Sequence, residues 1–350
     1  MSLLTATTGL AGGISVAGWG SALPDRRVTN HDLAQTLDTS DEWIVERSGI
    51  RERRWAGEGE STGPLAIAAA RRALERAHVA AKDVDVVIVA TCTPERPIPS
   101  TSAMVSSELG ISAGAFDLNA ACAGFVYGLT TTSALVEAGV ARTALLIGAE
   151  TMTSVIDPED RGTAVLFGDG AGALVLRGSP GHDPAAPGLV ASDLVNDPAG
   201  IDLLVVPAGG SARPASPETV AAREHYLRMD GREVFRRAVR AVEASIGRTL
   251  ARAGYTAKDV GLFVPHQANA RIVDAVLART GLAPERTCST VDRYGNTSAA
   301  SIPIALAEAA EAGTVTPGDL VLLCGFGAGL TVGTALWRWG TPTPPGRQAA

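Results

Sequence analysis

The chain has 350 residues, 46% of them hydrophobic and only 4% aromatic, and it carries a formal net charge of -7 at pH 7. This composition is typical of a folded, soluble protein with a sizeable core, and it argues against a general nucleic-acid binder, whose affinity comes from clustered positive charge. The first residues lack the basic run of a signal peptide and no stretch approaches the roughly 20 apolar residues that span a bilayer, so we expect a cytoplasmic protein without a membrane partner.

Strands and helices are expected in alternation along the chain. Apolar, β-branched runs alternate with alanine-rich segments of helical length, a pattern that predicts strands buried on both faces and covered by helices. The expected strands are 84–90, 115–119, 144–148, 171–176, 260–264 and 320–324. The expected helices are 64–78, 232–253 and 299–312. The fold class is therefore α/β.

An internal repeat is the most informative feature of the sequence. Residues 73–90 resemble residues 249–265, since each segment holds a helix end, an AKDV turn and a strand. A second match joins residues 134–149 to residues 307–325 at an offset of 174 residues. We therefore expect two halves of similar fold.

The repeat also predicts how the halves are divided. We place an N-terminal half at 14–180 and a C-terminal half at 181–340. The stretch 178–219 is rich in Pro, Gly, Ala and Ser, and we interpret it as a surface excursion with little regular structure. Adding the offset of 174 to Cys122 gives Asn296, so these two residues are predicted to occupy equivalent places, each just before a helix.

Cys122 is the leading candidate for a nucleophile. It lies where the expected strand 115–119 turns into a helix. A thiol at a helix N-terminus is exposed to the positive end of the helix dipole, which favours the thiolate. The alternative is a small buried hydrophobe, the usual role of an isolated cysteine in an alanine-rich turn. The predicted placement opposite Asn296 favours the nucleophile.

His266 and Asn296 are the other candidates for chemistry. His266 follows the strand 260–264 in the run VPHQAN, at the carboxyl end of a strand where α/β proteins commonly place their sites. Asn296 stands in a Gly-Asn turn, where its amide could donate a hydrogen bond to a developing enolate oxygen. Both could instead be structural, the histidine at a strand end and the asparagine as a turn residue or N-cap.

Arginines form a row along the expected helix 232–253. Arg232, Arg236 and Arg240 follow one another at four-residue spacing. Such a row is ordinarily a solvated face of a helix, and the functional alternative is a basic docking surface for an acidic carrier protein. No cluster of His and Cys has the spacing of a metal site, so we expect no metal.

Taken together, five segments resemble the β-ketoacyl-acyl carrier protein synthase III family, the initiating condensing enzymes of fatty-acid synthesis within the thiolase superfamily. The segments are TSDEWIVERSGIRER (39–53), FDLNAACAGF (116–125), DPEDRGTAVLFGDGAGA (157–173), VPHQAN (264–269) and DRYGNTSAAS (292–301). The resemblance implies a thiolase-like, five-layered αβαβα fold built from two duplicated halves, and a homodimer. It implies acyl-CoA and malonyl-acyl carrier protein as substrates, and no cofactor, because acyl-CoA is itself consumed.

The resemblance further implies residue roles. Cys122 would accept the acyl group, while His266 and Asn296 would drive decarboxylation and stabilise the carbanion. Backbone N–H groups of Cys122 and Ala328 would hold the thioester oxyanion. Positions that match CoA or substrate contacts are Thr39, Trp43, Arg47, Arg161, Gly231, Phe235 and Asn269. Positions that match carrier-protein contacts are Arg236, Arg271 and Arg279.

Three places depart from the common family pattern, and one of them is Leu330-Thr331-Val332, which replaces a usual Phe-Thr-Trp. Ala328 replaces a common glycine, which keeps the backbone N–H but adds a methyl group near the oxyanion. Ile98 stands where some members carry Phe at the end of the acyl pocket, a position that the partner subunit contributes. The smaller side chain would admit longer or branched primers.

Two other functions fit the same sequence. A relative in secondary metabolism would prime a polyketide or transfer an acyl group without decarboxylation. A catalytically silent scaffold would keep the fold without the chemistry. The intact set of Cys122, His266 and Asn296 favours condensation over both, while the identity of the primer stays open.

Overall fold

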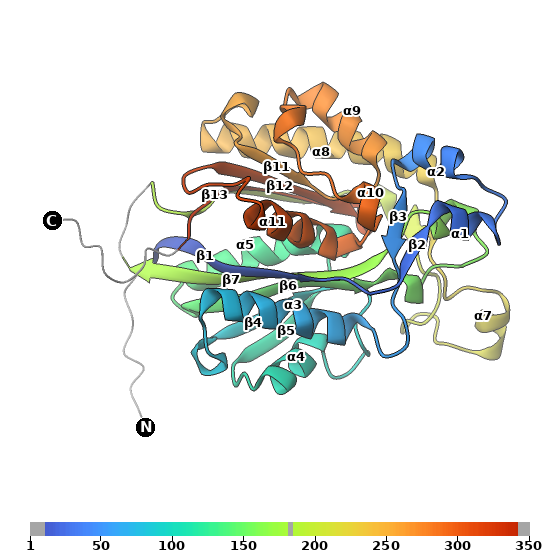
Figure 1. Cartoon of the computed structure of the whole chain (residues 1–350), viewed down its shortest axis with the longest axis horizontal. Helices are drawn as coiled ribbons and strands as arrows, with labels where there is room; N and C mark the ends of the chain where they lie inside the picture. Colours follow the sequence, from blue (N-terminus) through green and yellow to red (C-terminus); the bar gives the residue numbers. More distant parts are fainter. Residues whose placement is uncertain (1–10, 181–184, 342–350) are drawn as a thin grey trace.

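The computed structural model describes residues 11–180 and 185–341, in which most strands belong to two sheets (Figure 1). The first sheet has the order β1-β7-β6-β4-β5, with β1 Ala11–Ala22, β4 Val86–Ala90, β5 Gly114–Leu118, β6 Thr143–Thr151 and β7 Asp169–Pro180. The second sheet has the order β11-β12-β13-β8, with β8 Gly188–Asn196, β11 Leu262–Pro265, β12 Leu320–Gly327 and β13 Thr331–Arg338. Two short ribbons pair β2 (Arg27–Thr29) with β3 (Glu52–Arg54) and β9 (Leu204–Val205) with β10 (Arg228–Met229).

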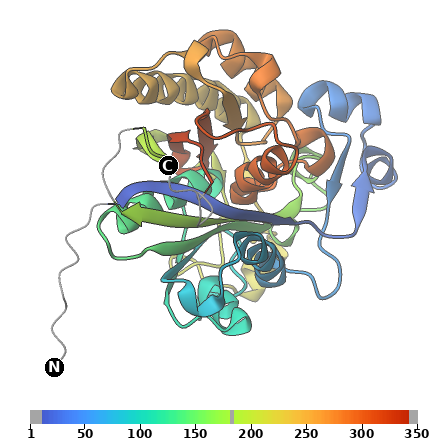
Figure 2. The same cartoon turned by 60° about the vertical axis from the view of Figure 1, so that its left-hand side comes forward.

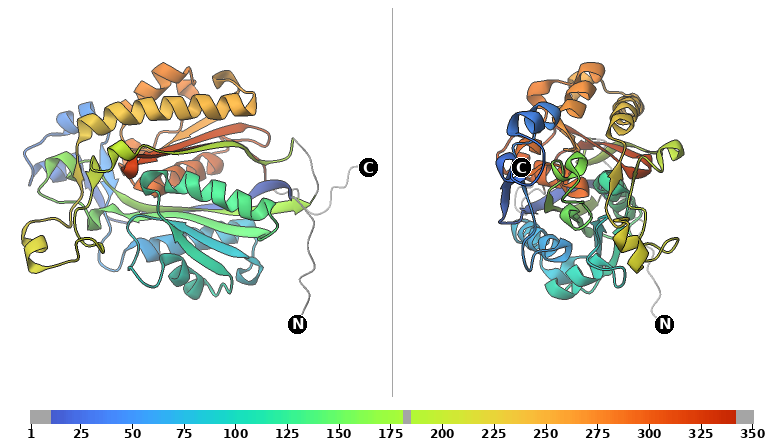
Figure 3. Two further views of the ribbon diagram at one scale, coloured as in Figure 1. Left: turned by 180° about the vertical axis from the view of Figure 1, so that it is seen from behind. Right: turned by 90° about the vertical axis from the view of Figure 1, so that its right-hand side faces the viewer.

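Helices cover both sheets and separate them. The long helices are α3 Thr62–Ala77, α4 Thr101–Leu109, α5 Gly124–Glu137, α8 Gly231–Ala253, α9 Ala270–Thr280 and α11 Ser301–Glu311. The first sheet is covered on its outer face by α3 and α4, the second by α8 and α9, and α5 and α11 lie between the sheets (Figures 1 and 3). The turned view keeps this order of layers (Figure 2). The predicted five-layered αβαβα fold is confirmed.

The burial of each helix follows from its layer. Between the two sheets, α11 is buried on almost every residue and its sequence SIPIALAEAAE is apolar nearly all round. In an outer layer, α8 buries one stripe that includes Val239, Val242 and Ile246 and leaves Arg232, Arg236 and Arg240 exposed. No helix in the described ranges is long and apolar enough to cross a membrane.

Short helices lie at one end of the layers, where the ribbon β2–β3 also lies (Figure 1). They are α1 Asn30–Ala34, α2 Asp41–Ser48, α6 Arg161–Ala164, α7 Pro217–Ala221 and α10 Val291–Tyr294. Four of them begin with an N-cap whose side chain accepts a hydrogen bond from the first turn: Thr29 for α1, Ser40 for α2, Asp160 for α6 and Ser216 for α7.

The two halves repeat the same elements, but the register of the repeat differs from the prediction. A 3₁₀ turn precedes α5 at Ala121–Ala123 and α11 at Ser298–Ala300, 177 positions further on. Because α5 has 14 residues and α11 has 11, the offset of 174 seen at the helix ends is too small at the helix starts.

Cys122 therefore corresponds to Ala299, and the predicted equivalence of Cys122 and Asn296 is wrong. The true counterpart of Asn296 is Asn119, and both asparagines make the same local bond. Asn119 Oδ1 accepts from the N–H two residues later at 3.1 Å, and Asn296 Oδ1 does the same at 2.9 Å. Cys122 and Asn296 still lie just before the central helix of their own half.

The segment 178–219 is not a plain surface excursion, because β8 within it pairs antiparallel with β13. The strand escaped prediction since one of its inward positions is polar. Asp193 is buried and accepts hydrogen bonds from Ser245 at 2.8 Å and Arg248 at 2.7 Å, both on α8. A buried carboxylate interrupts the alternation of apolar residues by which a strand is recognised.

Candidate active site

One cavity of about 470 Å³ brings the three predicted reactive residues together. It is lined by Cys122 from the first half and by His266 and Asn296 from the second. Predicted contact residues that also line it are Trp43, Arg47, Gly231, Phe235, Asn269 and Arg271. The site is therefore shared between the halves, as a duplicated fold with facing helix starts allows.

Cys122 lies at the floor of the cavity in the 3₁₀ turn between β5 and α5. Its neighbour Ala121 has a positive φ of 47°, which turns the chain sharply at this point. The strand β12 approaches so closely that a Cβ at Gly327 would lie 2.5 Å from the backbone nitrogen of Cys122. Glycine is required at 327 because the nucleophile's backbone occupies the space of a side chain.

Burial controls the acidity of this thiol. Cys122 is 6% exposed, and burial raises the pKa of its thiol to about 12, with the charge of Glu150 adding to the rise and a hydrogen bond with Ser298 opposing it. The position at a helix start favours the thiolate but does not outweigh burial, so the thiol is neutral at neutral pH.

His266 is held by its backbone and by one ring nitrogen. Its N–H donates to the Cys324 carbonyl at 2.7 Å, and its Nδ1 lies 2.7 Å from the Ser301 hydroxyl. The ring also meets Phe326 edge-on, with centroids 5.3 Å apart. Burial lowers the pKa of His266 to about 3, so the imidazole is neutral at neutral pH. Among the described residues no carboxylate bonds to the ring.

Asn296 is fixed so that its amide N–H₂ is left for a ligand. The Asn296 N–H donates to the Leu166 carbonyl at 2.8 Å, and the Gly168 N–H donates to the Asn296 carbonyl at 3.0 Å. The side-chain Oδ1 accepts from the Ser298 N–H at 2.9 Å. Since an N–H only donates, Oδ1 is the bonded atom and Nδ2 is the free donor.

Comparison with known proteins identifies the family of the chain. Two family models match the chain, 3-oxoacyl-[acyl-carrier-protein (ACP)] synthase III over residues 116–198 and its C-terminal counterpart over residues 250–339. A β-ketoacyl-[acyl-carrier-protein] synthase III of Roseiflexus sp. (strain RS-1) is 49% identical over 326 residues, which are 93% of this chain and 98% of that protein. The chain belongs to the β-ketoacyl-acyl carrier protein synthase III family.

Solved structures of the family superpose over almost the whole chain. The 3-oxoacyl-(acyl carrier protein) synthase III of Pseudomonas aeruginosa PAO1 is 44% identical with a TM-score of 0.86, covering 95% of this chain and 100% of its own. The priming β-ketosynthase of the R1128 polyketide biosynthetic pathway is 37% identical with a TM-score of 0.87, covering 97% and 100%. The chain is a condensing enzyme of the acyltransferase class, and the predicted resemblance is confirmed.

Beneath the synthase site lies a buried carboxylate that the sequence analysis missed. Glu150 is the second-last residue of the buried strand β6. It accepts hydrogen bonds from the Ser298 hydroxyl at 2.9 Å and from the N–H groups of Cys92 at 3.1 Å and Thr93 at 3.0 Å. It thus ties the first sheet to the turn that follows Asn296. Its only signal in the sequence was a lone acid after an apolar strand.

Two further residues were overlooked inside recognised motifs. Gln267, in VPHQAN, donates to the Pro265 carbonyl at 2.9 Å and accepts from the Thr290 N–H at 2.9 Å, which fixes the turn after His266. Ser301, the last residue of DRYGNTSAAS, bonds the His266 ring. Position in a motif could have identified both.

The outer end of the cavity is built around an aromatic ring. Arg47 and Arg161 place their guanidinium carbons 4.7 and 4.8 Å from the centre of the Trp43 ring. Arg161 also donates to the Asp38 carbonyl at 2.7 Å, beside Thr39. Arg161 and Thr39 do not line the cavity itself. The predicted nucleotide contacts thus gather at one mouth.

The remaining predicted positions lie outside the cavity lining. Ala328 follows Gly327, the residue that touches the Cys122 backbone. Ile98 is 87% exposed. Arg236 pairs with Glu233, and Arg279 pairs with Glu243 at 2.5 Å.

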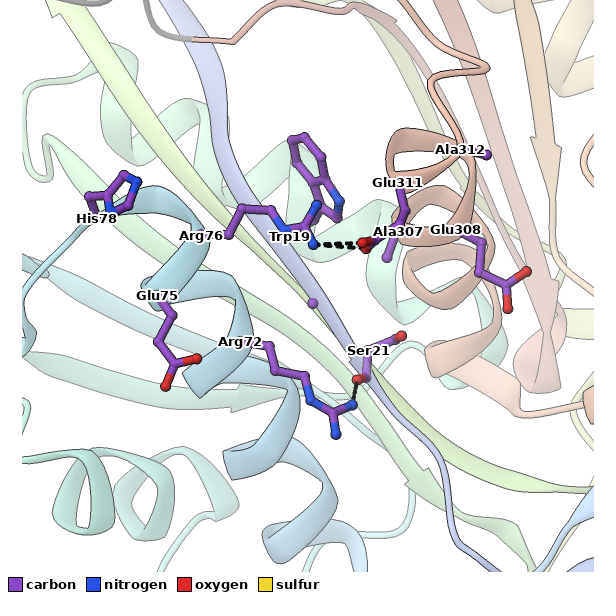
Figure 4. Close-up of a pocket in the computed structure, with 11 residues that line it drawn as sticks. Trp19, Ser21, Arg72, Glu75, Arg76, His78, Ala307, Glu308, Glu311 and Ala312 are labelled. Atoms are coloured by element: carbon purple, nitrogen blue, oxygen red, sulfur yellow. Dashed lines mark hydrogen bonds and ion pairs between the residues drawn. The ribbon is translucent and has the colours of Figure 1, made fainter.

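A second, larger hollow of about 780 Å³ lies between α3 and α11, across β1 (Figure 4). Its two arginines already have partners: Arg76 pairs with Glu311 at 2.8 Å, and Arg72 donates to the Ser21 carbonyl. No cysteine lines it. It offers no thiol to carry an acyl group, so size does not identify the active site here.

Proposed function

We propose that this enzyme condenses a short acyl-CoA primer with malonyl-acyl carrier protein, with loss of carbon dioxide, to give a β-ketoacyl-acyl carrier protein and so initiate fatty-acid synthesis. The observation that carries the proposal is the meeting of Cys122, His266 and Asn296 in one cavity. The names of the family relatives, which are synthases acting on acyl carrier protein, support it.

In the first stage the Cys122 sulfur attacks the thioester carbonyl of acyl-CoA. The carbon–sulfur bond to CoA breaks, and the thiol proton of Cys122 leaves with the CoA sulfur. The developing oxyanion accepts hydrogen bonds from the backbone N–H groups of Cys122 and Ala328, which lie on the two chain segments packed together at Gly327. The product of this stage is an acyl-cysteine.

In the second stage malonyl-acyl carrier protein loses carbon dioxide, and the electrons of the broken bond form an enolate. The His266 imidazole and the Asn296 amide donate hydrogen bonds to the enolate oxygen, in a buried site where such bonds are strong. The enolate carbon attacks the acyl-cysteine carbonyl, and Cys122 leaves and regains a proton. Neutral donors serve here because the charge that they stabilise exists only during reaction.

Trp43, Arg161, Thr39 and Arg47 are proposed to hold the nucleotide end of CoA, and Gly231, Phe235 and Asn269 the pantetheine arm. The guanidinium carbon of Arg161 lies 4.8 Å from the centre of the Trp43 ring. A planar base stacked between the two needs about 7 Å, twice a carbon–carbon contact distance, so Arg161 must withdraw when CoA binds.

Carrier-protein docking is proposed at Arg271, Arg236 and Arg279. Arg271 is exposed, lines the cavity mouth and lies 6.0 Å from the Phe235 ring, which favours it as the contact nearest the entering arm. Arg236 and Arg279 already pair with glutamates, but exposed ion pairs exchange partners at a cost below about 1 kcal/mol.

A homodimer in the cytoplasm is proposed as the working state. The strand β5 forms an open edge of the first sheet and carries Phe116, which is 39% exposed, while Ile98 nearby in the chain is 87% exposed. A second copy on this face would cover both side chains and bring Ile98 to the partner's acyl pocket. Cys92, Cys122, Cys288 and Cys324 are free thiols, in keeping with a reducing compartment.

The experiment that tests the function has two parts. Mass spectrometry after mixing with acetyl-CoA or isobutyryl-CoA should find an acyl adduct on Cys122 that the variant C122A lacks, and comparison of the two primers reports the pocket size. Acylated enzyme should then release carbon dioxide from malonyl-acyl carrier protein. Acylation without carbon dioxide release would indicate simple acyl transfer, and no adduct would indicate a silent scaffold.

Priming of a polyketide is the second candidate, favoured by the likeness to the R1128 priming β-ketosynthase at 37% identity. Polyketide priming differs from the initiation of fatty-acid synthesis in the carrier protein that receives the product. A rate with a fatty-acid carrier protein at least equal to that with a polyketide carrier protein supports the first candidate.

A further inference from the structure

Ser301 occupies an unusual place for a hydroxyl group. It is the first residue of α11, it is 1% exposed, and its Oγ lies 2.7 Å from His266 Nδ1. The corresponding residue of the first half is Gly124, which begins α5 and has no side chain. The fold therefore does not require a hydroxyl at this place, and its presence in the second half coincides with the histidine.

The hydrogen bonds around Ser301 determine which atom donates. The backbone N–H of Gln267 points at the Ser301 oxygen over 3.4 Å, and an N–H only donates. Within the described ranges the hydroxyl has one other polar neighbour, His266 Nδ1. If Nδ1 also donated, the hydroxyl hydrogen would be buried without an acceptor, at a cost in free energy. The arrangement is satisfied when the hydroxyl donates to Nδ1.

We propose that Ser301 is a positioning residue that holds His266 as the tautomer with its proton on Nε2. The neutral ring has one N–H, and Ser301 keeps it on the nitrogen that is left for the cavity. His266 then donates a hydrogen bond to a bound carbonyl, as Asn296 Nδ2 does, and it does not accept the proton of the resting thiol. This inference rests on the proposed function for its role in decarboxylation, but the tautomer itself does not.

The Gln267 N–H, which faces the Ser301 oxygen, is held in place by the bonds of the Gln267 side chain. The Gln267 side chain donates to the Cys288 carbonyl at 3.1 Å and accepts from the Val291 N–H at 3.2 Å. Because both ends of this side chain are bonded, the Gln267 backbone cannot turn away from Ser301. The Ser301 oxygen therefore faces an N–H on the side of Gln267, which leaves its own hydrogen to point at Nδ1.

The direct test is the ¹⁵N NMR spectrum of the histidine rings in the whole enzyme. The two tautomers differ in which ring nitrogen carries the proton, and protonated and unprotonated nitrogens give distinct signals. The chain has five histidines, and the signal that H266Q lacks belongs to His266. We expect a proton on Nε2 in the wild type. A proton on Nδ1 in the wild type would overturn the proposal, whatever the enzyme's activity and without any variant at Ser301.

Kinetics distinguish this role from a structural one. S301A should slow carbon dioxide release from malonyl-acyl carrier protein about 3- to 10-fold, the worth of one hydrogen bond, while acylation of Cys122 changes less than about twofold. S301T keeps the hydroxyl and should restore the rate. Ser133 is an equally buried serine in α5 whose hydroxyl donates to the Leu129 carbonyl, so S133A is the matched control.

Equal losses in both steps, or no recovery in S301T with a folded protein, would contradict the proposal. A wild-type enzyme that released no carbon dioxide would refute the proposed function instead, and the NMR result would still decide the tautomer.

Discussion

Replacing Glu150 by glutamine should destabilise the protein and at the same time make the Cys122 thiol more acidic. The carboxylate is fully buried, and its oxygens face only donors: the N–H groups of Cys92 and Thr93 and the hydroxyl of Ser298, among others. A glutamine keeps the shape but turns one oxygen into an NH₂ group. In either orientation of the amide, its NH₂ group faces a backbone N–H. A backbone N–H cannot become an acceptor, so one hydrogen bond is lost.

The size of the effect follows from these bonds. A buried donor without a partner costs about 1–3 kcal/mol, and bonds to a charged acceptor are worth about 1.5–3 kcal/mol each, so E150Q should lower the free energy of unfolding by about 2–4 kcal/mol. Burial is the main reason that the pKa of Cys122 is raised, and the negative charge of Glu150 adds to the rise. Removal of that charge therefore lowers the pKa.

Urea unfolding followed by circular dichroism measures the first effect, and the pH dependence of alkylation by iodoacetamide measures the second. The matched control is E285Q, which changes an exposed glutamate in the same way and should alter neither. A variant E150Q as stable as E285Q would refute the argument that the carboxylate organises the turn. Alkylation that needs a higher pH than in the wild type would refute the electrostatic part.

Three other results are expected. G327A should be acylated much more slowly and lose about 1–3 kcal/mol of unfolding free energy, because its Cβ would meet backbone atoms. The control is G247A in α8, where a Cβ would have nothing within 4 Å; it should be at least as stable as the wild type in urea and be acylated as fast by mass spectrometry. Folding lowers the pKa of His266 to about 3, so its contribution to stability is present above the unfolded pKa of about 6.5 and is lost as the pH falls towards 3. Urea unfolding should therefore show that the wild type loses about 1 kcal/mol of unfolding free energy between about pH 7 and about pH 5.5, and that H266Q does not. An equal dependence of unfolding free energy on pH in both proteins would contradict the assignment. R271E should raise the KM for malonyl-acyl carrier protein more than R236E does, with the KM for acetyl-CoA as the internal control, and an effect on both substrates alike would argue against a carrier contact.

Local sequence was sufficient for six strands of the two sheets and for three of the long helices. The strands at 86–90, 144–148 and 320–324 were predictable because they are buried on both faces and read as unbroken apolar runs. The helix 232–253 was predictable because its one buried stripe has the helical period. Errors arose where a buried position is polar, as at Asp193 in β8, and where one copy of the repeat is longer than the other.

The reactive residues could be recognised one by one, but their surroundings could not. Cys122 and His266 stand in recognisable motifs, yet burial sets both protonation states, and burial depends on what other layers place above them. Ser301 and Glu150 act through bonds to residues 35 and 148 positions away. No periodicity or local pattern carries such a pairing.

By itself the amino-acid order determined an α/β chain in two similar halves, a family, and three side chains able to perform a condensation, because each of these is written in short contiguous segments. Only the tertiary structure decided that the thiol is neutral, that the asparagine presents its N–H₂ group, and that the imidazole bonds a serine. These properties arise because side chains from distant segments bury one another, and burial decides which polar atoms are bonded within the protein.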